Sequence, residues 1–406
     1  MKAFILAAGK GTRMRPLTAY TPKPLLPVAG KPILQHTIDQ LEGKVEEVIV
    51  LVGWQGRQLM ESLHSKDTKI TYAQQTEQLG TAHAISIARD HVDDKFICIN
   101  GDVLLSPGAL KKFVDRFESS ESSMMAVTQI EDPVGYGIIE TEGELITDII
   151  EKPKVPTSND VNAGIYGFTE DIFHAIERTE ISSRGEYEIT DSLRLMMEEN
   201  NLKVHRLKEG VWFELSRPWD MLWANSELLG DVSPELREGH IEDGVHMEGF
   251  VSVAKGAVVR RGSYIRGPVY IGENADIGPN CLIRGATSIG KNCKVGNAVE
   301  VKNSIIMDNS NVPHHNYVGD SIIGKNCNLG SGTKVANLRL DGKNIIVTHQ
   351  KKRIDTGIRK LGVIMGDNVK TGINSSLNVG TIIGQDSFIG PGAMAEGEIA
   401  PKSWIQ

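Results

Sequence analysis

The first hundred residues alternate between short apolar runs and stretches in which apolar residues recur with a helical period. The apolar runs predict buried strands at 3–7, 47–52, 69–73 and 96–100, and the periodic stretches predict helices at 33–41, 58–63 and 81–89. Strands that alternate with helices pair into a mainly parallel sheet covered on both faces. Because ligands bind beyond the carboxyl ends of such strands, we expect a site where loops follow the first strand and residue 100.

The pattern changes at about residue 251, where aliphatic residues recur at every sixth position and helical periodicity is lost. The series consists of Val253, Val259, Ile265, Ile271, Ile277, Ile283, Ile289, Val295 and Val301. A period of six with glycines at the corners is typical of a hexapeptide β-helix, in which each turn buries its inward face on the next. The period breaks at 307–323 and at 335–365, where we expect loops to leave the stack.

Together the two patterns predict a two-domain chain of the α/β class that ends in a left-handed hexapeptide β-helix. The predicted boundaries place the first domain at 1–229, a linker at 230–250 and the β-helix at 251–406. A length of 406 residues with 40% hydrophobic content is enough for two such cores.

Charge and cysteine usage narrow the class of protein. A formal net charge of -8, without a long basic run in the first half, argues against nucleic acid as the main partner. No apolar stretch approaches the ~20 residues that span a bilayer, so we expect no membrane partner and a cytoplasmic location. The cysteines lie far apart, which predicts neither a zinc site nor disulfides. We expect Cys281, Cys293 and Cys327 to pack at small-residue positions of the repeat.

The segment LAAGKGTRMRPLT, at 6–18, follows the first predicted strand and combines two glycines with three cations. Glycines allow backbone N–H groups to approach a phosphate chain, and the cations offset its charge. The spacing matches neither the Walker loop nor the Rossmann fingerprint, so a solvated basic turn is the alternative. Prolines on both sides of Lys23 fix the backbone there, which favours a site for a nucleoside triphosphate.

The stretch from Leu6 to Pro32 resembles the signature of the sugar-1-phosphate nucleotidylyltransferases. Further segments of this family follow in order: QTEQLGTA at 75–82, GD at 101–102, GYG at 135–137, EKP at 151–153 and NAGIY at 162–166. The resemblance implies a Rossmann-like nucleotidyltransferase domain that binds Mg2+, a sugar 1-phosphate and UTP, with dTTP as the alternative. A sugar-phosphate oxygen attacks the α-phosphorus, so the protein mainly aligns anions and offsets charge.

The resemblance also implies a role for each matching residue. Arg13 and Lys23 would stabilise the triphosphate as catalytic residues, and Asp102 would hold Mg2+. The implied nucleotide-binding residues are Ala8, Gly9, Gly11, Gln75, Gly80 and Thr81. The implied sugar and sugar-phosphate ligands are Gly137, Glu151, Lys152 and Asn162. Taken without the family, residue types alone leave open a turn residue at 102, a surface ion pair at 151–152 and a turn or capping residue at 162.

One segment departs from the family's pattern. Relatives often supply the second metal ligand from a sequence like WLDxG, whereas this chain has WFELS at 212–216. Glu214 is the candidate for that ligand, because it carries the same charge on a longer side chain. A structural salt bridge is the alternative role for Glu214.

The first break in the repeat contains PHHNYVGD, at 313–320, which resembles the acetyltransferase site of the bacterial bifunctional uridylyltransferase/glucosamine-1-phosphate acetyltransferases. His314 and Tyr317 have the separation found in that family. The resemblance implies that His314 takes a proton from the sugar amine as the amine attacks acetyl-CoA. The other matching positions are Arg284 and Lys302, which would bind the sugar phosphate, and Asn328 and Asn337, which with Tyr317 would position the sugar or the developing oxyanion.

The two resemblances therefore imply a bifunctional enzyme of UDP-N-acetylglucosamine synthesis. A homotrimer is expected, because sites in solenoids of this type resemble those shared between neighbouring subunits. Glucosamine 1-phosphate, with galactosamine 1-phosphate left open, would be acetylated by acetyl-CoA and then uridylylated. One alternative is a glucose-1-phosphate uridylyl- or thymidylyltransferase with a non-catalytic β-helix. The other is a regulatory subunit without catalysis, against which the intact Lys23 and Asp102 argue. The basic segment at 351–360 would bind coenzyme A phosphates or project into solvent.

Overall fold

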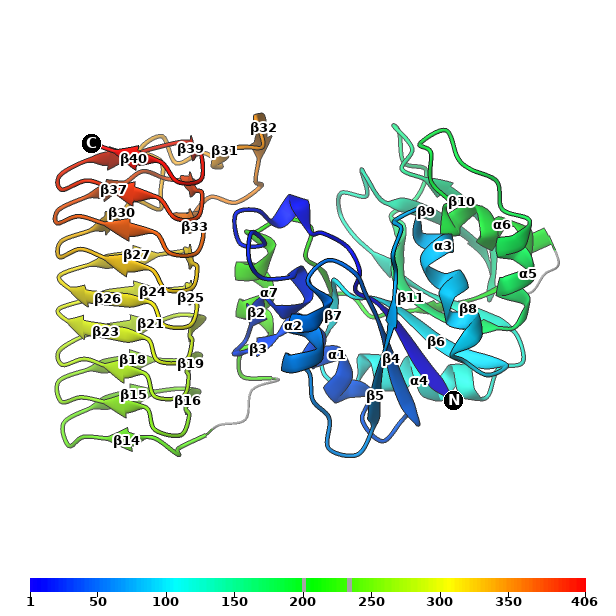
Figure 1. Cartoon of the computed structure of the whole chain (residues 1–406), viewed down its shortest axis with the longest axis horizontal. Coiled ribbons are helices and arrows are strands. Elements are labelled where there is room, and N and C mark those ends of the chain that lie inside the picture. The colour runs from blue at the N-terminus through cyan, green and yellow to red at the C-terminus, as the bar shows by residue number, and fades with distance from the viewer. Residues whose placement is uncertain (199–201, 232–235) are drawn as a thin grey trace. The chain divides into compact units, whose positions relative to one another are not determined.

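The protein is described here by a computed structural model, which covers residues 1–198, 202–231 and 236–406 (Figure 1). Two compact units form, and neither is continuous in sequence. The first contains Met1–Lys10 and Ile33–Glu214, and the second contains Gly11–Pro32 and Leu215–Gln406. Most of the glycine-rich signature, from Gly11 onward, therefore belongs with the C-terminal part of the chain.

A mixed sheet forms the centre of the first unit. Its strands are β1 (Lys2–Leu6), β4 (Glu47–Val52), β5 (Lys69–Gln74), β6 (Lys95–Asn100), β8 (Ser123–Gln129), β9 (Gly137–Glu142), β10 (Leu145–Glu151), β11 (Asp160–Thr169) and β12 (Leu202–Arg206). They pair in the order β5-β4-β1-β6-β11-β8-β12-β10-β9. The first four are parallel, as predicted, but β11 runs antiparallel to both β6 and β8. The sheet is therefore less uniformly parallel than the first hundred residues indicated.

Six α-helices accompany this sheet within the described residues. They are α1 (Ile33–Leu41), α2 (Gly56–Ser62), α3 (Thr81–Ser86), α4 (Ala109–Glu118), α5 (Asp171–Glu177) and α6 (Ile189–Glu198). The helix predicted at 81–89 ends at Ser86, and a 3-10 turn at Ile87–Asp90 follows it. A buried apolar core, with Phe4, Phe96 and Phe168 fully enclosed, binds helices and strands together.

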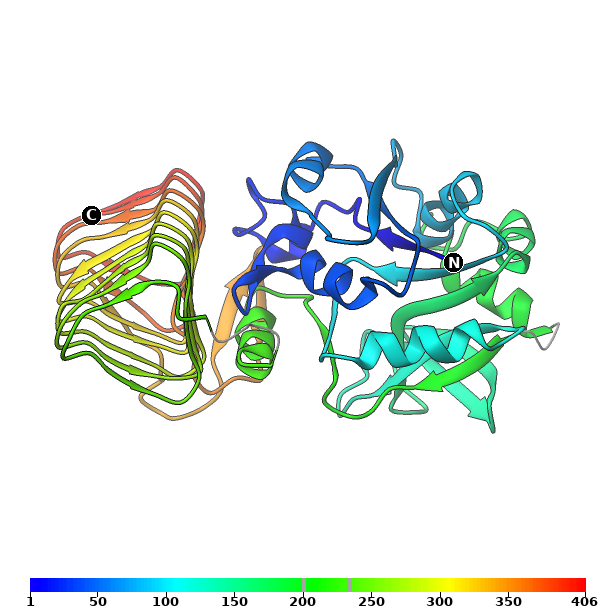
Figure 2. The same ribbon diagram turned by 90° about the horizontal axis from the view of Figure 1, so that it is seen from below.

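The second unit contains a stack of short parallel strands, seen along the stack in Figure 2. Within the described residues the strands form three sheets, of nine, eight and eight members. Every residue of the predicted aliphatic series lies in one buried core, together with Cys281, Cys293 and Cys327. Burial raises the pKa of the Cys293 and Cys327 thiols to about 12, so these groups are neutral packing residues, as predicted.

The two breaks in the repeat have different structural causes. At the first break, β23 (Lys294–Asn297) pairs with β26 (Asn311–His314). Asp276 pairs with Lys294 on the coil before, and Lys294 pairs with Asn311 on the coil after, so the coil at the break is one residue shorter than the preceding one. At the second, an antiparallel hairpin of β31 (Ile346–His349) and β32 (Lys352–Asp355) leaves the stack. Only the second break thus produces a projecting loop.

Two segments before residue 251 already pack with the stack. β14 (His240–Ile241) and β15 (His246–Glu248) pair in parallel with its next strands, within the range predicted as a linker. The helix α7 (Asp220–Leu228) lies earlier still, and its buried Asn225 donates a hydrogen bond to the Ala286 carbonyl oxygen and accepts one from Ser288. Sequence periodicity does not reveal these contacts, because they depend on which residues meet in space.

Candidate active sites

The signature begins where β1 ends, at the carboxyl edge of the parallel strands. The Gly101 backbone N–H donates to the Leu6 carbonyl oxygen at 3.0 Å, which brings Asp102 to the end of β1. Ala8 is buried, and its carbonyl oxygen accepts a hydrogen bond from Gln78 Nε2 at 2.8 Å. Gly9 follows as an exposed residue. The loops after β1 and β6 therefore lie together in the first unit, as the strand pattern predicted.

The candidate base-binding segment packs against the loop that precedes α6. Gln75 is 8% exposed, and its Nε2 lies 3.3 Å from His83 Nδ1. Thr81 begins α3, and its hydroxyl oxygen accepts a hydrogen bond from the Ile189 backbone N–H. Gly80 lies between two backbone hydrogen bonds, in which Tyr187 N–H donates to the Leu79 carbonyl oxygen and Ala82 N–H donates to the Tyr187 carbonyl oxygen. Sequence reasoning missed this role of Tyr187, which belongs to none of the recognised motifs.

Three candidate sugar ligands from three strands lie side by side. Gly137 opens β9 and pairs with Glu151 at the end of β10, while Val161 of β11 pairs with Ile138. The neighbouring Asn162 donates from Nδ2 to the Tyr166 hydroxyl at 2.8 Å and accepts from the Gly164 backbone N–H. The structure thus brings together residues that were predicted separately from three short motifs.

The carboxylate of Glu151 has two cationic neighbours. Lys152 Nζ lies 3.0 Å from Glu151 Oε1, and Arg184 Nη1 lies 3.3 Å from the same oxygen. Arg184 also contacts Glu188, and its side chain is 44% exposed. Sequence reasoning missed Arg184, which lies between two recognised motifs and has no motif of its own. It adds a second cation beside the candidate sugar-phosphate ligand Lys152.

The two candidate metal ligands are placed by a short strand pair. β13 (Trp212–Glu214) runs antiparallel to β7 (Val103–Leu105), and Glu214 is opposite Val103, the residue after Asp102. Both residues are half-buried, and the Oε2 atom of Glu214 is fully buried. No cluster of three or more His, Cys, Asp or Glu side chains suited to a metal occurs in the described part of the chain. Two carboxylate ligands fit Mg2+, which commonly keeps water and phosphate oxygens as its other ligands.

The catalytic candidates Arg13 and Lys23 lie on the part of the signature that belongs to the second unit. Arg13 is exposed on a 3-10 turn at Thr12–Met14, and Lys23 opens another at Lys23–Leu25. Gly11 has a φ of 58° and lies so near Lys23 that an added Cβ would be 2.9 Å from the Lys23 Cβ. The Thr18 hydroxyl donates to the Gly11 carbonyl oxygen at 2.8 Å. These contacts hold the glycine turn against Lys23.

The candidate phosphate-binding residues of the β-helix are neighbours on successive coils. Arg284 of β21 (Leu282–Arg284) pairs in register with Lys302 of β24 (Glu300–Lys302). Each has a carboxylate partner: Arg284 Nη2 lies 2.7 Å from Glu300 Oε1, and Lys302 Nζ lies 3.1 Å from Asp320 Oδ2. Two cations are thereby held side by side on one face.

A buried carboxylate joins several of these residues into one network. Asp320 is 3% exposed and accepts hydrogen bonds from Lys302, Asn303 and Asn337. Asn337 also donates to the Tyr317 hydroxyl at 3.2 Å. A Cβ at Gly319 would lie 2.6 Å from that hydroxyl, so the close approach requires glycine. Asp320 ends the PHHNYVGD segment, but the sequence pattern indicated no role for it. Only its side-chain contacts reveal that role.

The remaining acetyltransferase candidates lie on another face of the stack. His314 is exposed at the end of β26, in the sheet that contains Asn297 opposite it on the preceding coil. Asn328 opens β29 (Asn328–Leu329) in the same sheet, opposite Asn311. Tyr317 opens β27 (Tyr317–Gly319) in the neighbouring sheet. Within one chain, His314 and Tyr317 therefore lie on either side of a corner of the β-helix.

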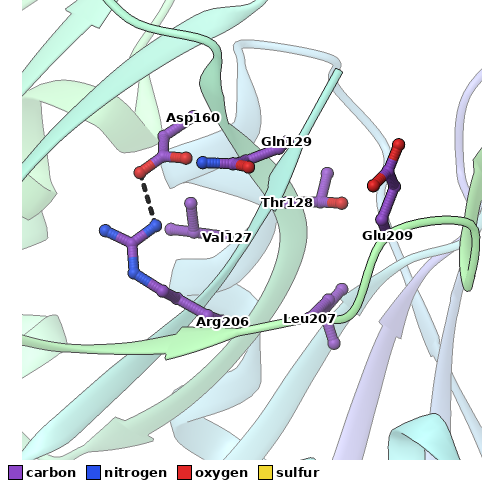
Figure 3. Close-up of a pocket in the computed structure, with 7 residues that line it drawn as sticks. All are labelled: Val127, Thr128, Gln129, Asp160, Arg206, Leu207 and Glu209. Atoms are coloured by element: carbon purple, nitrogen blue, oxygen red, sulfur yellow. Dashed lines mark hydrogen bonds and ion pairs between the residues drawn. The ribbon is translucent and has the colours of Figure 1, made fainter.

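A recess of about 270 Å³ lies elsewhere in the first unit (Figure 3). Asp160, Arg206 and Gln129 line it, and Arg206 binds both Asp160 and Thr141. It contains none of the predicted site residues.

No helix of the described ranges is long and apolar enough to cross a membrane.

Comparisons with known proteins find matches for both the α/β part and the β-helix part of the chain. Residues 2–230 match the family model described as nucleotidyl transferase, and residues 265–400 match the one described as the GMPPB C-terminal domain. The bifunctional protein GlmU of Methanocaldococcus jannaschii is 42% identical over 406 residues, which cover 100% of this chain and 97% of that protein. A solved UDP-glucose pyrophosphorylase complexed with UDP-glucose is 25% identical, with a TM-score of 0.51, over 55% of this chain and 96% of its own.

A second relative has a more explicit name. The bifunctional sugar-1-phosphate nucleotidylyltransferase/acetyltransferase of Sulfurisphaera tokodaii is 37% identical over 401 residues, which cover 98% of each chain. The match therefore runs through both the α/β unit and the β-helix. The chain belongs to the family of bifunctional sugar-1-phosphate nucleotidylyltransferases/acetyltransferases that includes the GlmU proteins.

Proposed function

We propose that this protein acetylates glucosamine 1-phosphate with acetyl-CoA and then transfers a uridylyl group from UTP to the product, which yields UDP-N-acetylglucosamine. The observation that carries the proposal is the full-length match to relatives named for both activities. The hydrogen-bonded network around Asp320 supports the acetyltransferase half. A non-catalytic β-helix or a regulatory subunit is not favoured, since the relatives that match both units are named as bifunctional.

Acetyl transfer requires a base near the sugar amine and cations near the sugar phosphate. We assign the base to His314, which takes the amine proton as nitrogen attacks the thioester carbonyl and the coenzyme A thiolate leaves. Arg284 and Lys302 bind the phosphate, and their spacing on successive coils suits one phosphate group. Asn337 and Tyr317 orient the sugar, since Asn337 binds both the Tyr317 hydroxyl and the Asp320 carboxylate. Asn328 supplies a further amide.

Nucleotidyl transfer requires the alignment of two anions. The sugar-phosphate oxygen attacks the α-phosphorus, and the pyrophosphate that leaves takes the negative charge. Arg13 and Lys23 offset that charge, while Gln75, Gly80 and Thr81 bind the base. Gly137, Glu151 and Asn162 bind the sugar, and Lys152 binds its phosphate. When bound to Asp102 and Glu214, Mg2+ supplies charge neutralisation for the phosphates.

The homotrimer, the cytoplasmic location and the use of acetyl-CoA belong to this proposal. We propose a trimer because sites in solenoids of this type resemble those shared between neighbouring subunits. The position of His314 and Tyr317 on two sides of a β-helix corner agrees with that idea.

The test is a substrate panel. Glucosamine, galactosamine, N-acetylglucosamine and glucose 1-phosphates would each be assayed with UTP and dTTP, with and without acetyl-CoA. We expect coenzyme A release with glucosamine 1-phosphate and pyrophosphate release with N-acetylglucosamine 1-phosphate and UTP. Pyrophosphate release without any coenzyme A release from either amino sugar would contradict the acetyltransferase assignment and leave the β-helix as a scaffold.

A further inference from the structure

The loop that contains Arg13 and Lys23 is attached to the β-helix at several points along its length. Tyr20 donates from its hydroxyl to Asp386 Oδ2 at 2.5 Å, and Lys325 Nζ donates to the Thr21 hydroxyl at 3.2 Å. Further on, the Ala29 backbone N–H donates to Oδ1 of Asn225 on α7 at 2.9 Å, and Asn225 in turn binds Ala286 and Ser288 of the β-helix. All of these residues belong to the second compact unit. The β-helix is thus the support on which this loop is built.

The arm of the loop around Arg13 is held by the hairpin of β31 and β32. His349 is at the end of β31, and its Nε2 atom lies 2.8 Å from the Arg15 carbonyl oxygen. The next residue, Gln350, donates from Nε2 to the Thr12 carbonyl oxygen. Two backbone carbonyls that flank Arg13 are therefore fixed by adjacent side chains of one hairpin.

The hydrogen bonds of His349 define its tautomer. A carbonyl oxygen only accepts, so Nε2 must carry the proton that is donated to Arg15. Nδ1 is then an acceptor, and Arg217 Nη1 donates to it at 3.3 Å. His349 is 2% exposed, and burial together with the Arg217 charge lowers its pKa, against opposing effects of the Arg15 carbonyl and Glu398. The ring is therefore neutral near pH 7 and holds both partners at once.

We infer that His349, a residue of the acetyltransferase domain, is a positioning residue for nucleotidyl transfer, because it fixes the backbone on which Arg13 meets the triphosphate. This inference rests on the proposed function of the loop. It deepens that function, since it gives the projecting hairpin a task in the other reaction. The coupling is structural, because the imidazole acts through the Arg15 carbonyl oxygen.

A pair of substitutions separates the two hydrogen bonds of the ring. The amide of glutamine places Nε2–H near the position of the imidazole Nε2, whereas asparagine is too short to reach it. His349→Gln should therefore keep the bond to Arg15 and lose the one to Arg217, while His349→Asn should lose the bond to Arg15. Both variants remove the aromatic ring, so any effect of lost packing is shared.

We expect His349→Asn to lower kcat/KM for UTP by about fivefold to tenfold, which is the worth of one hydrogen bond, chiefly through a higher KM. His349→Gln should stay within about twofold of the wild type. Gln350→Ala should show a smaller loss of the same kind, because the Gln350 side chain is exposed. Ile346→Ala, on the exposed side of the same hairpin, is the matched control and should change neither activity.

Acetyl transfer by the same samples completes the experiment. We expect it to be unchanged in all four variants. Equal losses in the Asn and Gln variants, a loss of both activities, or an unchanged kcat/KM for UTP in His349→Asn would each overturn the inference. A wild-type protein that transfers acetyl groups but no nucleotidyl group would instead contradict the proposed function itself.

Discussion

The two candidate sites are held together in different ways. In the β-helix, Lys302, Asp320, Tyr317 and Asn337 come from successive coils and are joined by side-chain hydrogen bonds. In the α/β unit, the candidate sugar ligands come from three strands and meet through backbone pairing. A solenoid brings residues one coil apart into contact, whereas a sheet gathers loops that are distant in sequence. Substitutions in the β-helix site should therefore be more strongly coupled to one another.

The largest expected effect separates the two regions by their need for metal. Excess EDTA should abolish nucleotidyl transfer and leave acetyl transfer intact, because only the first reaction is assigned a metal bound by Asp102 and Glu214. Glu214→Gln should lose most of the nucleotidyl activity for the same reason. An assay of both reactions on one sample checks this, and full nucleotidyl transfer in EDTA would refute the metal assignment.

The next effect tests whether each region works without the other's catalytic group. His314→Ala should reduce acetyl transfer about 10²–10⁴-fold, the usual contribution of a general base, and spare nucleotidyl transfer. Lys23→Ala should do the reverse, since it removes a charge from the triphosphate site. Loss of both activities in either variant would point to damaged folding, and a His314→Ala loss much below tenfold would exclude a base.

A smaller effect is expected from the centre of the network. Asp320→Asn leaves Lys302 without its counterion, so acetyl transfer should fall about tenfold to a hundredfold while nucleotidyl transfer persists. Asp276→Asn is the matched control, because Asp276 pairs with Arg260 on an earlier coil outside the network. Steady-state rates with glucosamine 1-phosphate provide the measurement.

The same network offers a direct test of coupling. The double variant Asp320→Asn with Tyr317→Phe should lose less activity than the product of the two single losses, since Asn337 connects them. Strict additivity would show that the hydrogen bonds do not act together and would remove the contrast between the two regions.

The smallest effect concerns stability of the α/β unit in acid. Burial, with a lesser effect of Arg116, lowers the pKa of His205 to about 4, while its unfolded value is near 6.5. The unfolded state therefore binds more protons between these values, so stability is lost as the pH falls from about 6.5 to 4. The expected contribution is on the order of 1–3 kcal/mol.

Replacement by a neutral side chain should remove that sensitivity. When the pH is lowered from 7 to 5, the thermal midpoint of His205→Gln should fall by a few degrees less than that of the wild type. His174→Gln is the control, because His174 is exposed on α5 and lies in the same unit. Parallel pH dependence of the wild type and His205→Gln would exclude the effect.

The repeat and the early strands were predictable because each depends on local periodicity. The aliphatic series from 253 to 301 is buried throughout, and the helix at 33–41 and the strand at 47–52 have the predicted bounds. The motif residues were recognised because the chemistry of phosphate and sugar binding restricts residue types. Arg184 and Asp320 were missed as functional residues, since neither stands in a periodic position and each acquires its role from a neighbour distant in sequence.

What the sequence determined by itself is the inward face of the β-helix and the set of chemical groups, because burial and charge are properties of each position. Only the tertiary structure decided how those groups are supported. The signature reads as one continuous segment, yet contacts assign Gly11–Pro32 to the unit that contains the β-helix. The hydrogen bonds of His349 and Gln350 to Arg15 and Thr12 span more than three hundred residues. Contacts of that range depend on the folded path of the chain, which no local pattern encodes.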